Sequence, residues 1–342
     1  MPINIDEHAG FNSPERQERI VQLIADSNLL LQNIPMKDIT SDRYVWWQET
    51  SLDTSVGPRA INSNFNEGSA KFNEQTANLK IYGSTLQVDR HLLETDNGNQ
   101  AAAKMDAKIK STLFRITNDM IHGDPSTTPE EMNGMFRLIA EGNNFYTGLG
   151  NYPLIHSGIA GITTAQLNRA VGFGVNNAAA GVIVTASAAN RALLVEAIDR
   201  AIERGPGQFD MMIMPGRVKQ IIKQAMRESG SMLESVERWG IPLESYGNIP
   251  IVVLPKFPDG GSIMDFNELS PDGATSSACA SILLVKFGME EYYYAVRKND
   301  FQVMPFEKVS GTVFYQGEVE VKLNQIVARP DSVIRIGGIR LV

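Results

Sequence analysis

The chain has 342 residues, of which 43% are apolar and 20% charged, with a formal net charge of −8. This length favours two lobes or one elaborated domain, and the composition is that of a soluble globular protein. No run approaches the roughly 18 apolar residues that a membrane-spanning helix needs. The N-terminus lacks a signal-peptide pattern, and the scattered Lys and Arg residues disfavour a nucleic-acid-binding module.

The first 42 residues are expected to form an arm. Residues 1–12 show no periodicity, so they predict an extended tail. Ser13-Pro14-Glu15 then starts a helix, because Ser is a favoured cap and Pro suits the first helical position. Apolar residues at helical spacing carry this short helix to about Gln32. Such a stripe favours an ordinary packing helix over a partner-binding one.

A long hairpin is expected to follow the arm. Residues 43–48 are rich in Tyr, Val and Trp, which favour a strand, and residues 57–68 contain turn-forming Gly, Pro and Asn. Residues 71–89 return as a strand, with Gly83 as a bulge. A ribbon with exposed aromatic residues invites aggregation unless another surface covers it. The residues expected to make this contact are Trp46, Trp47, Arg59, Phe65 and Phe72.

The returning strand leads to a long helix over residues 100–122, ended by Gly123 and followed by Pro125. At 1.5 Å per residue this helix is about 35 Å long. Its apolar residues step by four, four, three and four, which places them on one face. They are Met105, Ile109, Leu113, Ile116 and Met120.

The second half of the chain predicts an α/β unit followed by an antiparallel sheet. A helix around Leu194–Ile202, a buried strand at 210–214, a helix at 217–227 and a strand at 249–254 follow one another. Strands are then expected at 281–287, 291–296, 313–327 and 333–336. Residues 313–327 alternate apolar with charged residues, as in a strand with one wet face. The fold class is therefore α+β.

The search for chemistry finds no catalytic, cofactor-binding or metal-binding residues. The four histidines lack metal-ligand spacing, and no nucleophile elbow, phosphate loop or dinucleotide motif is present. His122 is expected to interact with the dipole at the helix C-terminus. Cys279, the single cysteine, is expected to be a packed thiol. Adjacent acids such as Glu130-Glu131 and Glu290-Glu291 are expected to be solvated.

This order of elements resembles the major capsid proteins of tailed bacteriophages. The sharpest similarity is in Phe72-Asn-Glu-Gln-Thr-Ala-Asn-Leu-Lys80 and Val88-Asp-Arg-His-Leu-Leu-Glu94. In that family a similar Gln-Thr-Ala-Asn run closes the extended loop. The spine helix there ends in a Gly-Asp turn like Gly123-Asp124, before an Asn/Gly turn like Asn133-Gly134. Looser matches at 213–216 and 246–250 extend the resemblance over nearly all of residues 40–342.

The resemblance implies the phage capsid fold, with an extended β-hairpin loop, a long spine helix, a peripheral domain and an α/β axial domain. It implies the following division: N-terminal arm 1–42, extended loop 43–80, peripheral domain 81–139 with 281–342, spine helix 100–122 and axial domain 140–280. The implied function is building an icosahedral shell around a double-stranded DNA genome.

The implied partners are other copies of the chain, in hexamers and pentamers. The resemblance also allows a separate scaffolding protein, a portal and a decoration protein as partners. DNA would be enclosed without sequence-specific binding, and no membrane is involved. The protein would be part of the virion and would be assembled in the host cytoplasm.

Two departures from the family matter. Some relatives join a loop lysine to a neighbour's asparagine, but Phe65 stands where that lysine would be, so no isopeptide cross-link is expected. Only about 40 residues precede the loop, so no fused scaffolding segment is expected. Two alternatives remain open: an encapsulin-type bacterial compartment with the same subunit fold, and a soluble α/β enzyme, which would be a monomer or a small oligomer.

Overall fold

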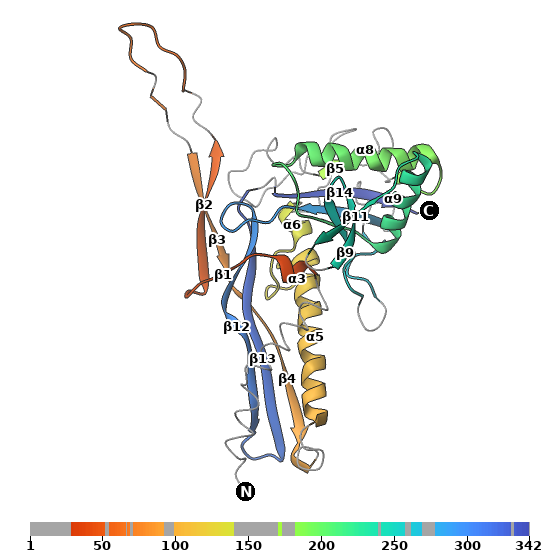
Figure 1. The fold of residues 1–342 in the computed structure, drawn as a ribbon. Helices are drawn as coiled ribbons and strands as arrows, with labels where there is room; N and C mark the ends of the chain where they lie inside the picture. Colours follow the sequence, from red (N-terminus) through yellow and green to blue (C-terminus); the bar gives the residue numbers. More distant parts are fainter. Residues whose placement is uncertain are drawn as a thin grey trace.

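The protein consists of a long stem, a lobe beside it and a hairpin that projects from the stem (Figure 1). Its described strands form a four-stranded sheet, an eight-stranded sheet and a two-stranded sheet. The helix expected from Ser13 lies outside the described residues except for α3 (Leu29–Asn33). The computed structural model describes residues 29–51, 55–65, 67–68, 71–91, 99–139, 170–172, 182–238, 241–256, 261–268, 278–329 and 332–341.

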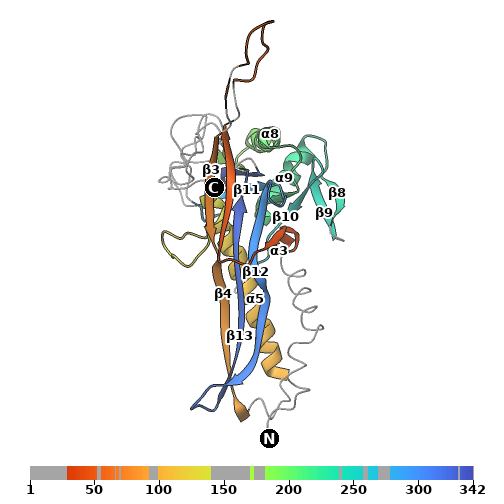
Figure 2. The ribbon, with the colours of Figure 1, turned by 90° about the vertical axis from the view of Figure 1, so that its left-hand side faces the viewer.

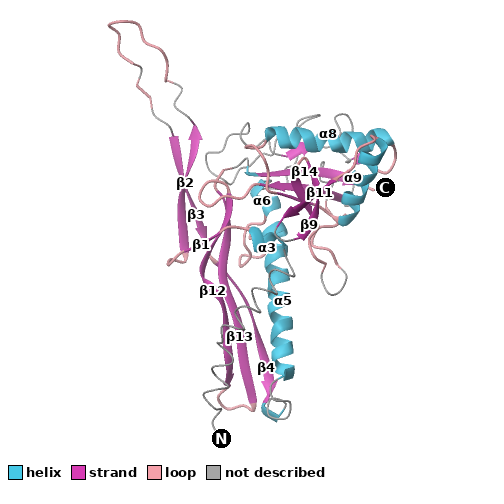
Figure 3. Ribbon diagram, in the orientation of Figure 1, coloured by secondary structure: helices cyan, strands magenta, loops and turns pink. Residues whose placement is uncertain are grey.

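The stem combines the predicted long helix with an antiparallel sheet (Figures 1 and 3). Helix α5 spans Asn99–His122, and all five residues of its predicted apolar stripe are at most 3% exposed. The stripe is buried because its spacing keeps these side chains on the face turned to the sheet. The sheet order is β1 (Met36–Asp38), β12 (Tyr293–Lys308), β13 (Phe314–Val327) and β4 (Lys80–Asp89).

The alternation predicted for residues 313–327 is confirmed in β13. Val319, Val321 and Leu323 are buried, whereas the charged residues 318, 320 and 322 are half-exposed. The returning strand predicted at 71–89 is two strands, β3 (Lys71–Asn78) in the hairpin and β4 in the stem, which separate at Leu79.

The bulge predicted at Gly83 is wrong. Gly83 pairs with Glu320 in an unbroken antiparallel register between β4 and β13. A Cβ atom at this position would lie 2.4 Å from the carbonyl oxygen of Val319. Glycine is therefore required here by close approach of the neighbouring strand, which is a second reason for glycine in a strand besides a bulge.

The lobe is the α/β unit that the second half of the chain predicted. Helix α8 packs against α9 and against strand β14. Strands β11 and β14 lie in the same sheet as β7 and β10, so residues 281–342 contribute to both large sheets. The elements are β5 (Ala170–Gly172), β6 (Val182–Ile183), α8 (Ala188–Arg204), β7 (Met211–Ile213), α9 (Gly216–Glu228), β8 (Glu234–Arg238), β9 (Ile241–Tyr246), β10 (Ile249–Val252), β11 (Cys279–Val285) and β14 (Val333–Arg340).

One hydrophobic core runs from the stem into the lobe. It joins Met105 and Leu113 of α5 with Met211, Leu283 and Val333 of the lobe sheet. A second cluster lies between that sheet and the helices α8 and α9. The continuous core fixes the lobe to the stem and leaves the hairpin as the part that extends away from both (Figure 2).

Candidate assembly surfaces

The hairpin is a two-stranded ribbon with two different faces. Strand β2 (Arg43–Ser51) pairs antiparallel with β3, which places Trp46 opposite Gln75 and Trp47 opposite Glu74. Successive side chains on a strand point to opposite faces. The two adjacent tryptophans therefore belong to different surfaces.

Trp46 lies on the face turned toward the stem. Its ring stacks on Tyr44, with centroids 6.1 Å apart and planes at 19°. Both rings join a small core with Tyr294 and Ile326. Trp46 is half-buried, and its indole nitrogen is buried without a hydrogen-bond partner among the described residues. Part of this side chain therefore packs within its own subunit, and its contact with a neighbour stays a prediction.

Trp47 lies on the outward face of the same ribbon and is 66% exposed. Val45, two residues earlier on the same face, is 41% exposed. Together they form an uncovered apolar patch on the described surface. The backbone of Phe72 pairs with Glu49 near the far end of the ribbon.

The tip of the hairpin is a short ordered turn that presents apolar side chains. Arg59 donates through Nη1 to the Ser63 carbonyl at 2.9 Å, and its guanidinium lies 5.1 Å from the centre of the Phe65 ring. The Ser63 N–H donates to the Ala60 carbonyl at 3.2 Å. Ile61 is 94% exposed and Phe65 is 67% exposed. Internal bonds thus hold the turn while its large apolar side chains face solvent.

The base of the hairpin is tied to the stem by charged side chains. The hydrogen bond from Lys298 lowers the pKa of Asp42, so this carboxylate stays charged at lower pH than an ordinary aspartate. The Asp42–Lys298 pair is 2.8 Å long and the Asp38–Arg297 pair 2.6 Å. Lys37 and Glu290 form a further pair, and hydrogen bonds to Glu290 and Tyr44 raise the pKa of Lys37.

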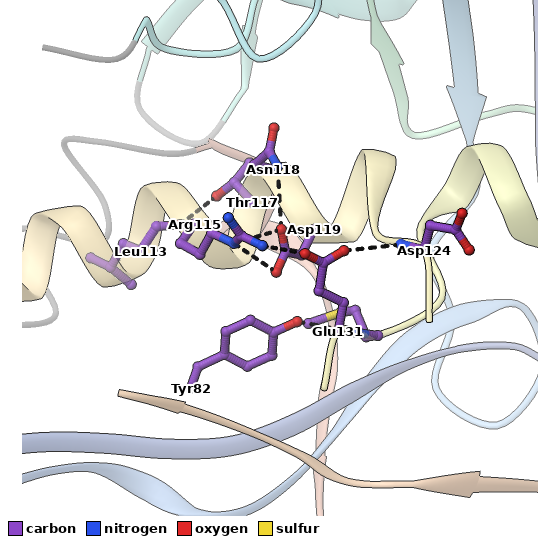
Figure 4. Close-up of polar contacts among 9 residues, drawn as sticks. Tyr82, Leu113, Arg115, Thr117, Asn118, Asp119, Asp124 and Glu131 are labelled. Atoms are coloured by element: carbon purple, nitrogen blue, oxygen red, sulfur yellow. Dashed lines mark hydrogen bonds and ion pairs between the residues drawn. The ribbon is translucent and has the colours of Figure 1, made fainter. Parts of the chain in front are cut away.

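A network of charged residues holds the C-terminal part of α5 to the loop that follows it (Figure 4). Arg115 donates through Nε to Asp119 Oδ2 at 3.0 Å and through Nη2 to Glu131. The other oxygen of Glu131 accepts the backbone N–H of Asp124 at 3.1 Å. The Asp119 side chain is only 1% exposed, so removing Arg115 would leave a buried acidic side chain without its ion-pair partner.

The turn residues singled out by the family resemblance lie together at this helix end. The Gly134 N–H donates to the Gly123 carbonyl at 2.8 Å. A Cβ on Gly123 would lie 2.3 Å from the Met132 carbonyl oxygen, and one on Gly134 would lie 2.5 Å from the Gly123 nitrogen. The Tyr82 hydroxyl accepts the Met132 N–H at 3.2 Å, and burial raises the pKa of Tyr82.

The prediction that adjacent acids are solvated is wrong for Glu131, whose side chain is only 16% exposed. Its neighbour Glu130 is exposed, as expected. The two residues differ because only Glu131 points toward Arg115 and the loop backbone. The spacing of residues in the sequence cannot distinguish the two glutamates, because both follow the same turn residues.

A buried glutamine that the sequence did not single out joins β13 to the same helix end. Gln325 is 4% exposed, and its Nε2 donates to the Met120 carbonyl at 3.0 Å and to the Asn133 carbonyl. The Tyr293 hydroxyl donates to Gln325 Oε1 at 2.6 Å. One side chain therefore satisfies a helix-end carbonyl and a loop carbonyl together.

His122 joins the helix end to the lobe. Its Nε2–H donates to the Ile263 carbonyl at 2.7 Å, and its ring lies edge-on to Phe136 at 4.9 Å. Arg335 lies 4.0 Å above the same Phe136 ring and pairs with buried Glu268 at 2.7 Å. Burial lowers the pKa of His122, which favours the neutral imidazole, and its interaction with the helix dipole stays a prediction.

Cys279 is fully buried in β11, as predicted for a packed thiol. In the part of the chain that the structure describes, no group of three or more His, Cys, Asp or Glu side chains could hold a metal ion. Nor is any described helix long and apolar enough to cross a membrane.

The model of the SU10 major capsid protein family matches residues 4–272 of this 342-residue chain. The chain belongs to this family. It is therefore a phage capsid shell protein, and the family is a structural one. No curated protein sequence matches the chain.

Solved structures show the same capsid fold at low sequence identity. The encapsulin SrpI from Synechococcus elongatus PCC 7942 superposes with a TM-score of 0.59 at 8% identity, covering 92% of this chain and 88% of that one. The capsid of the empty GTA particle gives 0.59 at 12% identity, covering 90% and 88%. The mature capsid of bacteriophage PhiM1 gives 0.55 at 11% identity, covering 90% and 86%. The predicted α+β capsid fold is confirmed.

Proposed function

We propose that the chain forms the icosahedral head of a tailed bacteriophage, assembling as hexamers and pentamers around double-stranded DNA. Each subunit lays its hairpin, residues 43–80, across a neighbouring copy. The stem, with residues 81–139 and much of 281–342, is the peripheral domain, and residues 140–280 contribute most of the axial domain. Assembly takes place in the host cytoplasm, where a scaffolding protein, a portal and a decoration protein are candidate partners.

The single observation that carries the proposal is the exposed hairpin. Trp47, Ile61 and Phe65 are all more than 60% exposed on a ribbon that extends beyond the stem and lobe (Figures 1 and 2). Large apolar side chains at the end of a projecting element mark an interaction site. An identical subunit is the partner that a self-assembling shell always supplies at high local concentration.

We infer that the hairpin residues contribute unequally to the proposed intersubunit contact. Trp47 and Phe65 present their rings outward, whereas Arg59 supports Phe65 from within the tip. Trp46 contributes only the part of its ring that the stem leaves uncovered. Phe72 contributes from the paired part of the ribbon.

Charge supports DNA enclosure without sequence-specific binding. A net charge of −8 gives no general attraction for phosphate. A shell with this charge confines DNA without holding it tightly.

Deleting residues 57–68 tests the proposal. The truncated subunit is expected to remain folded, because the tip lies outside the described core clusters, and to sediment only as small species. Replacing tip residue Asn64 with Ser keeps the apolar side chains and serves as the control that still forms shells. A deletion variant that builds normal particles would refute the role of the hairpin.

An encapsulin shares this fold, so the contents of the particles distinguish a phage capsid from a bacterial compartment. We expect nuclease-resistant DNA within particles made in an infected host. Particles that hold a protein cargo and no DNA would favour the bacterial compartment.

A further inference from the structure

A polar pocket of about 460 Å³ lies where the C-terminal part of α5 meets the segment that precedes β11. Asn118 and His122 line the pocket from the helix, and residues 261–263, Asn267 and Glu268 line it from that segment. Volumes of this size are typical of sites that bind small organic groups. The contacts proposed for shell assembly do not use this pocket.

Glu268 contributes a buried carboxylate oxygen without a partner to the wall of this pocket. Its side chain is only 8% exposed. Oε2 accepts hydrogen bonds from Arg335 Nη2 at 2.7 Å and from the hydroxyl of Ser281. Oε1 is also buried, but no described residue donates to it. A buried acceptor without a donor costs stability, so the pocket is suited to a ligand that donates a hydrogen bond.

The carboxylate of Glu268 is held in position by its neighbours. The Glu268 N–H donates to the Cys279 carbonyl at 2.9 Å, and the Glu268 carbonyl accepts the Cys279 N–H at 3.0 Å. Arg335 Nε donates to Ser281 Oγ at 2.9 Å, so the guanidinium and the hydroxyl hold Oε2 together. Oε1 could reach these donors only if Oε2 gave them up. The donor for Oε1 must therefore come from elsewhere.

The helix side of the pocket offers two more acceptors. Asn118 Nδ2 donates to Asp119 Oδ1 at 3.2 Å, and the Asn118 carbonyl oxygen points away from Asp119 (Figure 4). His122 Nε2 carries the proton in its 2.7 Å contact with the Ile263 carbonyl, because a carbonyl oxygen only accepts. Burial lowers the pKa of His122, and the neutral ring then has a lone pair on Nδ1. Carboxylate, amide and imidazole acceptors thus belong to one pocket.

The charged side chains around this helix end favour a cation as the ligand. Buried Arg335 pairs with Glu268, and Arg115 pairs with both Asp119 and Glu131. When all are ionised, these three carboxylates and two guanidinium groups leave one negative charge. An anion would be repelled by the unpartnered oxygen of Glu268.

We propose that this pocket binds an alkylammonium group, which donates to Glu268 Oε1, Asn118 Oδ1 and His122 Nδ1. An ammonium group has three N–H donors and no acceptor, which matches three acceptors. A guanidinium group fits less well, because its planar fork prefers both oxygens of one carboxylate and Arg335 already occupies Oε2. A metal ion is disfavoured, because the described residues contain no group of three or more His, Cys, Asp or Glu side chains that could hold one.

Binding of n-butylammonium to the unassembled subunit tests the site. The chain has four histidines, so isotope-labelled histidine gives few NMR signals, and His122→Gln identifies the signal of His122. The ligand should shift that signal to saturation and leave the other three in place. n-Butanol lacks the charge and tetramethylammonium lacks N–H donors, so neither should shift it.

Substitutions test the assigned acceptors. Asn118→Ala should weaken n-butylammonium binding by about tenfold, because a hydrogen bond to a charged group is lost. Glu268→Gln should weaken it further, and Asn118→Ala decides the question if Glu268→Gln does not fold. Exposed Glu130→Gln makes the same charge change outside the pocket and should leave the affinity unchanged. Affinity should also fall below about pH 6.5, because protonated His122 carries a donor at Nδ1.

The ammonium group can come from a free amine or from a lysine side chain of a second copy. A water-soluble carbodiimide joins a carboxylate to an amine in contact with it. A link between Glu268 and a lysine of another subunit, found in assembled particles and not in unassembled subunits, would assign the group to a second copy. A link only to added n-butylamine would assign it to a free amine. Particles that give neither link would overturn the contact with Glu268.

The remaining outcomes decide the inference without involving the shell function. No shift of the His122 signal with n-butylammonium, or an equal shift with tetramethylammonium, would overturn it. Equal affinity of Asn118→Ala and the unmodified chain would overturn it as well. Particle formation by the unmodified chain tests the proposed function separately.

Discussion

Replacing Gln325 with Leu is expected to destabilise the subunit by about 3 kcal/mol. The side chain makes three hydrogen bonds from a buried position, to Met120, Asn133 and Tyr293. Each contributes about 1 kcal/mol net, and leaving a buried group unsatisfied costs about 1–3 kcal/mol. Leucine has a volume similar to that of glutamine, so its apolar contacts offset part of the cost of leaving buried groups without a hydrogen bond. A loss of about 3 kcal/mol corresponds to roughly a hundredfold change in the unfolding equilibrium constant.

Urea unfolding of the unassembled subunit, followed by circular dichroism, measures this loss. Tyr293→Phe should cost about 1–2 kcal/mol, because it removes one of the three bonds. The double variant should cost less than the sum, since both substitutions delete the same Tyr293–Gln325 bond. Gln316→Leu on the same strand is the control, because Gln316 bonds only to exposed Gln87 in the described structure. A loss below about 1 kcal/mol for Gln325→Leu would refute the reasoning.

The remaining predictions concern the helix end and its loop. Glu131→Gln should lower the unfolding free energy by about 1–2 kcal/mol. The control, exposed Glu130→Gln, should change it by less than about 0.5 kcal/mol. Equal effects would contradict the network of Glu131 with Arg115 and Asp124. Gly134→Ala should abolish soluble folded subunit, because its methyl group would lie 2.5 Å from the Gly123 nitrogen; a soluble variant of unchanged stability would count against this. The pKa of His122 is lowered by burial, so the unfolded chain takes up its proton first and stability should fall as pH drops below about 6.5. Comparison with His122→Gln isolates that slope, and identical pH profiles would show that another group causes it.

The elements with a strong periodic signal could be predicted from the sequence. The stripe of α5 and the alternation of β13 depend on spacing alone, and both are buried as expected. The hairpin was also predictable, because turn residues separate two segments with strand preferences. The capsid fold itself was inferred through a family resemblance and not from these patterns.

The buried polar groups could not be predicted. Gln325 and Arg335 lie on strands whose neighbours are apolar, and their partners come from segments more than 30 residues away. Local spacing gives no signal for such contacts. The role of Gly83 was missed for a related reason, since its requirement arises from the neighbouring strand β13. Residues 281–342 divide between two sheets, and only tertiary pairing decides that division.

The extended hairpin also shows the limit of composition. The sequence predicted that Trp46 and Trp47 both contact a neighbouring surface. Because successive side chains on a strand point to opposite faces, Trp46 faces the stem and Trp47 faces solvent. Assigning each tryptophan to its own surface requires knowing which face of the ribbon the stem covers.

Electron microscopy of particles made by the purified chain tests the central claim most directly. The account predicts closed icosahedral shells of hexamers and pentamers, in which the hairpin of each subunit crosses onto a neighbour. Sedimentation that finds only monomers or small oligomers in every assembly condition would contradict it, as would shells in which the hairpin contacts its own subunit alone.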